Sequence, residues 1–316
     1  MRLPLSDHCN GSRFFYPGLA PGRGFRDFLR WRLTRKPAKW PERVPIRPAA
    51  PPPAPDAGVS ATWIGHSTFL LRTAGASWLT DPVFSETVGP SRMLGLRRTV
   101  APALPLASLP RIEGVLLSHD HYDHCDLPSL RALAAPGTAV VAPLNYGFLR
   151  AAGAAAELVE LDWWQACEPG PQFHLRLVPA QHWCRRLPFG TNLRLWGGFF
   201  LRAGGRSVYF AGDTGYDPQL FAEIRRRCGS PDLALLPIGA YEPRWFMRDA
   251  HMNPAEAVQA HRDLGARRSA AMHWGTFGLA DEPREAPVRE LEAAREAAGI
   301  PAAEFRILSF GETILI

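Results

Sequence analysis

The chain has 316 residues, of which 46% are hydrophobic and 21% are charged, so it has the composition of a globular protein with a large core. Its five cysteines show no CxxC spacing, which argues against a disulfide framework and favours a reducing compartment such as the cytoplasm. No apolar run of about 18 residues is present, and the N-terminus lacks the apolar centre of a signal peptide, so we expect neither a transmembrane helix nor secretion.

The net charge of +6 is concentrated at the N-terminus. Residues 1–47 hold eleven Arg or Lys residues against three acids, whereas the rest of the chain holds 25 against 27. Such a segment suits an anionic neighbour, and we interpret residues 13–47 either as a peripheral membrane contact or as a solvated arm. Within it, GFRDFLRWRLTRK alternates basic and large apolar residues. This pattern predicts either an interfacial amphipathic helix or an arm whose aromatic side chains dock on the body.

Residues 45–58, PIRPAAPPPAPDAG, are mostly proline and alanine. This composition favours an extended polyproline II connector, because proline cannot continue a helix or a central strand. We therefore divide the chain into a basic arm with its connector, residues 1–58, and a main domain, residues 59–316.

The main domain begins with strand patterns and then alternates strands with helices. Strands are predicted at 62–64, 68–73, 77–80, 114–118, 138–142, 158–163, 173–178, 198–202, 206–211, 232–237 and 268–272. Helices are predicted at 126–134, 144–152, 218–228, 254–264 and 287–298. The last but one has the clearest start, with Asn253 as N-cap, Pro254 at the first turn and Glu256 in the capping-box position. Interleaved strands and helices favour a layered α/β architecture.

Titratable residues follow four of these strands at the point where each strand ends. The strand at 114–118 is followed by HDHYDH, and three later strands are each followed by one such residue: His182, Asp213 and His273. Ligands and catalytic groups of α/β proteins favour strand ends, where a rigid scaffold presents loops to a common cleft. We therefore expect these side chains to meet at one site.

The HxHxDH stretch has the composition of a metal site, because neutral imidazole and carboxylate are ligands that suit zinc. His119 and His121 can converge on one metal, whereas Asp123 and His124 diverge from that pair and can reach a second. Seven candidate ligands exceed one tetrahedral site and suit two metals that share a carboxylate: His119, His121, Asp123, His124, His182, Asp213 and His273. The alternative is a buried hydrogen-bonded cluster, which would cost several kcal/mol if its groups were unpaired.

Longer strings resemble a known family. HxHxDH followed by single His, Asp and His strand ends resembles the metallo-β-lactamase fold, which implies an αββα sandwich with two central sheets and two metals at the sheet edge. More specific strings, covering most of residues 60–285, are similar to the N-acylphosphatidylethanolamine-hydrolysing phospholipase D family: IGHSTFLL, LTDPVFS, SHDHYDH, QHWCRR, AGDTGY, PIGAYEPRWFM, HMNPAEAV and HWGTF. The extreme N-terminus and the residues after 285 match less clearly.

The resemblance implies how the ligands are shared. One zinc is held by His119, His121 and His182, the other by Asp123, His124 and His273, and Asp213 bridges them. Iron or manganese would accept the same ligands.

Three further residues near these ligands have open roles. His66 and Asp81 either fix the tautomers of metal ligands through hydrogen bonds or form structural turns. Asp120 is not implied as a ligand, and a plain solvent-exposed position is its simplest interpretation.

Four residues in the later strings are candidates for contact with substrate. His251 either contacts a substrate phosphate or caps the helix that follows it. Tyr241, Glu242 and Arg244 either orient a head group or, in the case of the last two, pair with each other.

The resemblance implies a zinc-dependent phosphodiesterase of phospholipase D type, which cleaves the head-group side of (N-acyl)phosphatidylethanolamine-like phospholipids by a metal-activated hydroxide, with Asp123, Asp213 and His251 as catalytic residues. Its expected partners are the phospholipid and the inner face of a membrane. No nucleic acid is expected, because basic residues cluster only in the arm. A homodimer is left open. Two other functions also stay open: a binuclear hydrolase of a soluble substrate such as a sugar-phosphate lactone, and a non-catalytic membrane-associated metal-binding protein.

Overall fold

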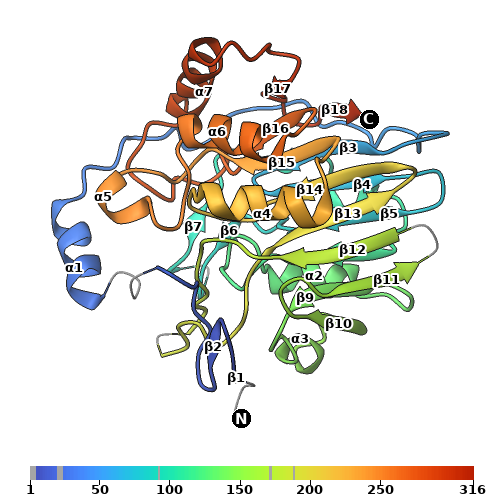
Figure 1. Cartoon of the computed structure of the whole chain (residues 1–316), viewed down its shortest axis with the longest axis horizontal. Helices are drawn as coiled ribbons and strands as arrows, with labels where there is room; N and C mark the ends of the chain where they lie inside the picture. Colours follow the sequence, from blue (N-terminus) through green and yellow to red (C-terminus); the bar gives the residue numbers. More distant parts are fainter. Residues whose placement is uncertain (1–4, 20–23, 92, 171–172, 188) are drawn as a thin grey trace.

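The computed structural model describes residues 5–19, 24–91, 93–170, 173–187 and 189–316 (Figure 1). Within them, two seven-stranded sheets form the centre of the molecule. The first sheet comprises β3 (Ser60–Gly65), β4 (Thr68–Arg72), β5 (Ser77–Thr80), β8 (Gly114–Leu116), β9 (Ala139–Pro143), β10 (Glu157–Leu161) and β18 (Thr313–Leu315). The second comprises β11 (Ala166–Gly170), β12 (Phe173–Val178), β13 (Gly198–Ala203), β14 (Arg206–Phe210), β15 (Leu233–Pro237), β16 (Ser269–Met272) and β17 (Phe305–Arg306).

Helices and short ribbons surround these sheets. The helices are α1 (Phe25–Thr34), α2 (Leu127–Leu133), α3 (Phe148–Ala151), α4 (Pro218–Cys228), α5 (Arg244–Met247), α6 (Pro254–Leu264) and α7 (Ala286–Ala297), with a 3-10 turn at Leu106–Ser108. Two small antiparallel ribbons lie outside the sheets: β1 (Leu5–Ser6) with β2 (Cys9–Asn10), and β6 (Thr87–Val88) with β7 (Leu96–Arg97).

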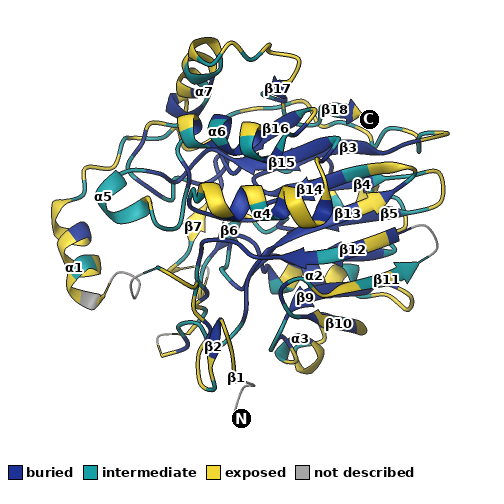
Figure 2. Cartoon of the chain, viewed as in Figure 1, coloured by how far each residue is buried: buried dark blue, intermediate teal, exposed yellow. Residues whose placement is uncertain are grey.

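The layers follow from the alternation of side chains along each strand. Phe69 and Leu71 of β4 pack in the core shared with the second sheet, whereas Leu70 packs in the core that includes Leu130 of α2 and Leu149 of α3. On the other side, α4, α6 and α7 bury one face against the second sheet and leave the opposite face exposed (Figure 2). The order of layers is helix, sheet, sheet, helix, and the expectation of an αββα sandwich is confirmed.

Strand direction brings several strand ends to one edge of each sheet. In the first sheet the order is β10-β9-β8-β5-β4-β3-β18, with β5 and β8 parallel and β3 separated from β5 by one antiparallel strand. In the second the order is β11-β12-β13-β14-β15-β16-β17, with β14, β15 and β16 parallel and β12 separated from β14 by one antiparallel strand. Thus β3, β5 and β8 share one direction, and so do β12, β14 and β16.

Most predicted elements are present, and the differences have local causes. The helix predicted at 144–152 is reduced to α3 because Asn145 adopts a φ of +74°, which the right-handed helix does not allow. The capping box of α6 is confirmed: the Asn253 side chain accepts from the Glu256 N–H at 2.9 Å, and the Glu256 carboxylate accepts from the Asn253 N–H at 3.0 Å.

The N-terminal arm lies against the body. The amphipathic helix predicted within residues 24–36 is present as α1, and Trp31 on this helix stacks on Phe246 of α5 at 5.0 Å between ring centroids. Arg35 pairs with Asp281 at 2.9 Å. The helix therefore forms and its tryptophan docks on the body, as the second alternative predicts, whereas contact of this helix with a membrane stays a prediction. The division at residue 58 stays a prediction. Among the described residues, no helix has the length and apolarity needed to span a bilayer.

Candidate metal centre

The titratable residues predicted from strand ends lie together at the edge where the two sheets meet. His66 and Asp81 follow β3 and β5 directly, and the HDHYDH stretch follows β8. In the second sheet His182, Asp213 and His273 follow β12, β14 and β16. These strands share a direction within each sheet, so their polar ends project to the same edge.

His119, His121 and His182 form the first group of donors. His119 Nε2 lies 2.9 Å from His121 Nδ1, and His182 Nε2 lies 3.3 Å from the same atom. Nitrogens bound at about 2.0–2.1 Å to a tetrahedral ion are about 3.3 Å apart, so this spacing suits a single metal held by three imidazoles. These are the three residues expected to share one zinc.

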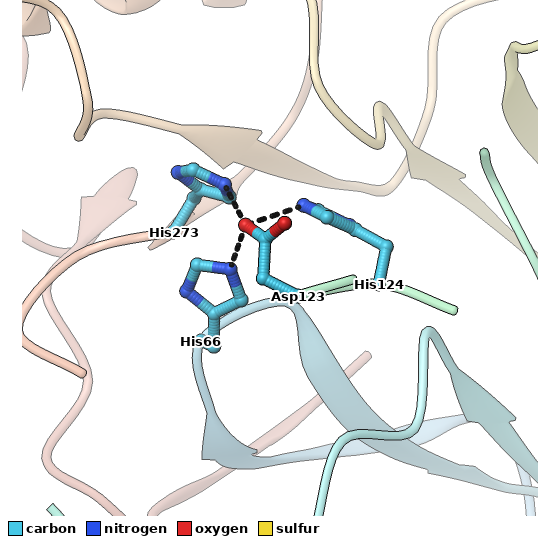
Figure 3. A group of neighbouring side chains, drawn as sticks. All are labelled: His66, Asp123, His124 and His273. Carbon is cyan, nitrogen blue, oxygen red and sulfur yellow. Dashed lines mark hydrogen bonds and ion pairs between the residues drawn. The ribbon is translucent and has the colours of Figure 1, made fainter. Parts of the chain in front are cut away.

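His66, Asp123, His124 and His273 form the second group (Figure 3). Asp123 Oδ2 lies 3.0 Å from His66 Nε2 and 3.5 Å from the Nε2 atoms of both His124 and His273. Figure 3 shows the three rings directed at this one carboxylate oxygen. The structure thus brings Asp123, His124 and His273 together, and His66 adds a nitrogen that was not among the expected ligands.

Asp213 lies between the two groups. Its Oδ2 atom is 3.2 Å from His124 Nε2 and 3.1 Å from His273 Nε2. It is also 3.9 Å from the Nε2 atoms of His119 and His182 in the first group. This is the position that a carboxylate shared by two cations requires.

Several donor atoms at the centre are buried and have no hydrogen-bond partner in the protein. They include Oδ1 of Asp213 and Nδ1 of His251. The Nε2 atoms of His124 and His273 also face the centre, where the carboxylates of Asp123 and Asp213 lie beside them. A buried polar group costs about 1–3 kcal/mol if it stays unsatisfied. Because imidazole nitrogens and a carboxylate oxygen are donors for divalent transition metals, the residues fit a pair of these ions.

Neighbouring groups fix which nitrogen of each ligand faces the centre. Asp81 Oδ2 lies 2.6 Å from His124 Nδ1, which directs Nε2 of that ring inward. His182 Nδ1 lies 2.9 Å from the Ala250 carbonyl and is held in the same way. Asp81 also accepts from the backbone N–H of Ser118 at 2.7 Å and from its hydroxyl at 2.5 Å. The role of Ser118 in holding Asp81 was not predicted, although its position beside His119 at the end of a strand could have indicated a place in the site.

The carboxylates divide the imidazoles into two classes of pKa. Burial lowers the pKa of His119 and His182 well below the usual range, and for His119 repulsion from neighbouring histidines adds to it. For His273, burial alone would lower the pKa, but the attraction of Asp213 and hydrogen bonds to both carboxylates outweigh it and raise the pKa to about 9. The pKa of His124 is raised well above its usual range for the same reason. A cation at the second group must therefore displace protons.

The backbone is strained at three of these residues. His66, Asp81 and His273 have φ values of 52°, 30° and 60°, in the left-handed region that side-chain-bearing residues avoid. Such conformations cost about 1–3 kcal/mol each and gather at functional sites. Gly212 directly precedes Asp213 and has a φ of 60°. A Cβ atom at this position would lie 2.7 Å from the Ser118 side chain, so the two sheets can approach this closely only because residue 212 is glycine.

The remaining predicted residues lie around the centre. His251 Nδ1 has no partner and lies 3.9 Å from Asp213 Oδ2, so this ring borders the site. The Arg244 guanidinium pairs with Glu256 at 2.7 Å rather than with Glu242, and also donates to the His251 carbonyl at 2.9 Å. Tyr241 and Glu242 line a cavity near the C-terminal end of α1. Their contact with a head group stays a prediction.

Asp120 corrects an interpretation from the sequence. The residue is fully buried, not exposed, and its Oδ2 atom accepts from Arg194 at 2.9 Å. Arg194 belongs to the loop before β13 and packs over Phe148 of α3. Its partner lay far along the sequence, so no local pattern could have indicated that Asp120 is buried.

Comparisons with known proteins agree with this geometry. Residues 77–274 match the model of the family described as β-lactamase superfamily domain. An uncharacterised protein of Mycobacterium tuberculosis is 40% identical over 264 residues, which cover 79% of this chain and 70% of that protein. N-acyl-phosphatidylethanolamine-hydrolysing phospholipase D 1 of Caenorhabditis elegans is 36% identical over 256 residues, covering 76% and 72%.

Solved structures show the same fold at lower identity. The isothiocyanate hydrolase from Delia radicum gut bacteria has a TM-score of 0.65 at 21% identity, covering 81% of this chain and 99% of that one. The metallo hydrolase Igni18 of Ignicoccus hospitalis has a TM-score of 0.58 at 22% identity, covering 82% and 98%. The chain belongs to the metallo-β-lactamase superfamily of metal-dependent hydrolases, in the family of the N-acylphosphatidylethanolamine-hydrolysing phospholipases D.

Proposed function

We propose that the protein is a phosphodiesterase of phospholipase D type that acts on (N-acyl)phosphatidylethanolamine-like phospholipids. The observation that carries the proposal is the position of Asp213 Oδ2 between two groups of histidine donors. A two-metal clamp of this kind suits in-line displacement at a phosphodiester. The choice of a phospholipid is supported by the name of the relative in Caenorhabditis elegans.

We assign zinc to the two groups, since imidazole and carboxylate suit it, although iron or manganese accepts the same donors. His119, His121 and His182 would hold one ion, Asp123, His124 and His273 the other, and Asp213 both. When bound, two such ions lower the pKa of water and stabilise negative charge on phosphoryl oxygens. His66 and Asp81 keep the second group oriented through their bonds to Asp123 and His124.

The chemical balance of the reaction is that of hydrolysis. Water supplies an oxygen to phosphorus, the bond from phosphorus to the head-group oxygen breaks, and the released alcohol takes up a proton. Burial lowers the pKa of His251 to about 4, so its ring is neutral at pH 7 and can donate one N–H to a phosphoryl oxygen. Trp183, whose ring lies 4.6 Å from that of His121, places an apolar surface beside the first group of donors.

The test is product analysis by mass spectrometry after incubation with a mixed phospholipid extract in water enriched in ¹⁸O. We expect phosphatidate that carries the label and unlabelled head-group alcohol. Release of free fatty acid would instead indicate cleavage of the acyl ester. Hydrolysis of a soluble sugar-phosphate lactone without any phospholipid turnover would replace the proposed function by the soluble alternative.

A further inference from the structure

Exposed apolar side chains are concentrated in three segments that we call the rim: residues 24–36, 86–97 without 92, and 183–189 without 188. Among the described residues, eleven large apolar side chains are exposed, and eight of them lie in the rim: Phe28, Leu29, Leu33, Met93, Leu94, Leu96, Leu187 and Phe189. The rim makes up less than a tenth of the chain, so this concentration is far from uniform. Large exposed apolar patches mark contact surfaces.

Two parts of the rim meet at a residue of the metal-binding stretch. Tyr122 donates its hydroxyl to the Arg186 carbonyl at 2.8 Å, and the Arg186 guanidinium lies over its ring at 4.2 Å. The same tyrosine packs against the cluster formed by Val88 of β6 with Val83 and Phe277. Residues 86–97 and 183–189 therefore flank Tyr122, one residue away from the ligands His121 and Asp123.

The third part, residues 24–36, is connected to the surroundings of the centre through α5. Trp31 of α1 stacks on Phe246, and Arg244 at the start of α5 holds the carbonyl of His251. Figure 1 shows α1 and α5 at the left of the molecule, away from the C-terminus, and β7 and β6 nearer its middle. Figure 2 shows exposed residues along α1. The rim is thus connected to the centre at Tyr122 and, through α5, at His251.

The net positive charge of the rim favours an anionic partner. Its described residues include eight arginines and lysines and only two acids, Asp27 and Glu86. Glu86 is already paired with Arg43 and Arg97, each at 2.9 Å. A second copy of the chain would bring like charges together, whereas each basic residue near an anionic bilayer contributes attraction of about 1 kcal/mol.

Arginines of the rim lie over tryptophan rings, in the rim and in α5 beside it. Arg30 lies 4.7 Å over the ring of Trp245, and Arg185 lies 5.2 Å over that of Trp183. Tryptophan and arginine are both suited to a lipid head-group boundary, since each combines an apolar body with a polar end.

We propose that the rim is the surface by which the protein docks on an anionic lipid bilayer, inserting Leu33, Met93 and Phe189 below the head groups. This inference rests on the proposed phospholipid substrate and adds how the enzyme reaches it. Docking would place the metal centre, bordered by the rim, against the head-group layer where the scissile bond lies.

The experiment is co-sedimentation of the full chain with vesicles of phosphatidylcholine and phosphatidylglycerol at a ratio of about 3:1, and with pure phosphatidylcholine vesicles. The variant Leu33→Gln/Met93→Gln/Phe189→Gln removes three side chains that are 78%, 95% and 90% exposed, so the fold should persist, which circular dichroism checks. The control Leu315→Gln changes a leucine that is 62% exposed in β18, outside the rim.

We expect wild type and Leu315→Gln to bind the anionic vesicles alike, and the triple variant to bind at least about 100-fold more weakly. Turnover of soluble bis-p-nitrophenyl phosphate should be equal in all three. Vesicle binding by the triple variant equal to that of the wild type would overturn the inference. If the wild type is a dimer and the triple substitution dissociates it without changing vesicle binding, the rim is a dimer interface and the inference is also overturned. Vesicle binding without hydrolysis of any phospholipid would count against the proposed function alone.

Discussion

The metal centre and the rim depart from the usual distribution of residues in opposite directions. The centre buries imidazoles and carboxylates, several of them without a protein partner, whereas the rim exposes leucine, methionine and phenylalanine to water. Both arrangements cost stability, so folding alone does not account for either. Under the two proposals these regions have separate tasks: the centre would carry the chemistry on a phosphodiester, and the rim would give access to a lipid surface.

The largest expected effect comes from removing a donor of the centre. Asp213→Asn and His273→Ala should lower turnover of both a soluble diester and a vesicle substrate by at least about 1000-fold, because charge stabilisation at phosphorus is lost. The amount of metal bound per chain, measured by plasma mass spectrometry, should be two equivalents in the wild type and lower in both variants.

The matched control is His174→Ala, since this histidine is exposed on β12 and pairs with Glu168 at 2.9 Å. It should keep wild-type activity and metal content. A fully active Asp213→Asn protein would show that the centre does not carry the chemistry.

The second effect concerns Asp120, the residue of the HDHYDH stretch that we expect to affect the stability of the fold and not metal binding. Asp120→Asn leaves the Arg194 guanidinium without its ion-pair partner, and we expect a loss of about 3 kcal/mol in the free energy of unfolding. Urea unfolding measures it, and Asp120→Asn/Arg194→Met should recover most of the loss. Metal content per folded molecule should not change. A selective loss of metal from a stable Asp120→Asn protein would instead make Asp120 part of the centre.

A third, smaller effect comes from the group that orients His124. Asp81→Asn weakens the hydrogen bond to His124 Nδ1 and should lower metal affinity about 10- to 100-fold, measured by competition with a chelator. Asp232→Asn is the matched control, because Asp232 also accepts from the backbone and hydroxyl of a serine, Ser207, but at the start of β15. Equal metal affinities of the two variants would show that Asp81 does not orient His124 for metal binding.

The smallest effect concerns pH and the N-terminal ribbon of β1 and β2, which lies outside both the centre and the rim. Burial alone would lower the pKa of His8, but hydrogen bonds to Asp162 and Asp7 outweigh it and raise the pKa above 6.5. Because the folded-state pKa is raised, the stabilisation is complete below pH 6.5 and is lost as pH rises through the folded-state value. The ribbon of β1 and β2 should then loosen, and so should the contact of Phe14 N–H with the Asn192 carbonyl.

Amide exchange at Phe14, corrected for intrinsic rates, should show this loss of protection above pH 6.5. Asp162→Asn should remove most of the pH dependence, because the main charged partner of His8 is gone. Protection that stays constant across this range in the wild type would contradict the assignment. Metal content should not respond to Asp162→Asn, since the pair lies outside the centre.

The sequence predicted the centre far better than the rim. Strand ends are local signals, so the ligand candidates after β8, β12, β14 and β16 were identifiable from short patterns. Strands β11, β17 and β18 were not predicted, and β18 is only three residues long and pairs with β3 from the other end of the chain. The rim combines segments that are far apart in the sequence. The sequence alone does not distinguish an exposed methionine such as Met93 from a methionine in the core, because exposure depends on the folded surroundings.

The most direct test of the central claim is anomalous X-ray diffraction from crystals of the metal-loaded protein. We predict two peaks, one contacting His119, His121 and His182, the other contacting Asp123, His124 and His273, with Asp213 touching both. A single peak in fully active protein, or metal bound away from Asp213, would contradict the account of a binuclear centre at the edge of the two sheets.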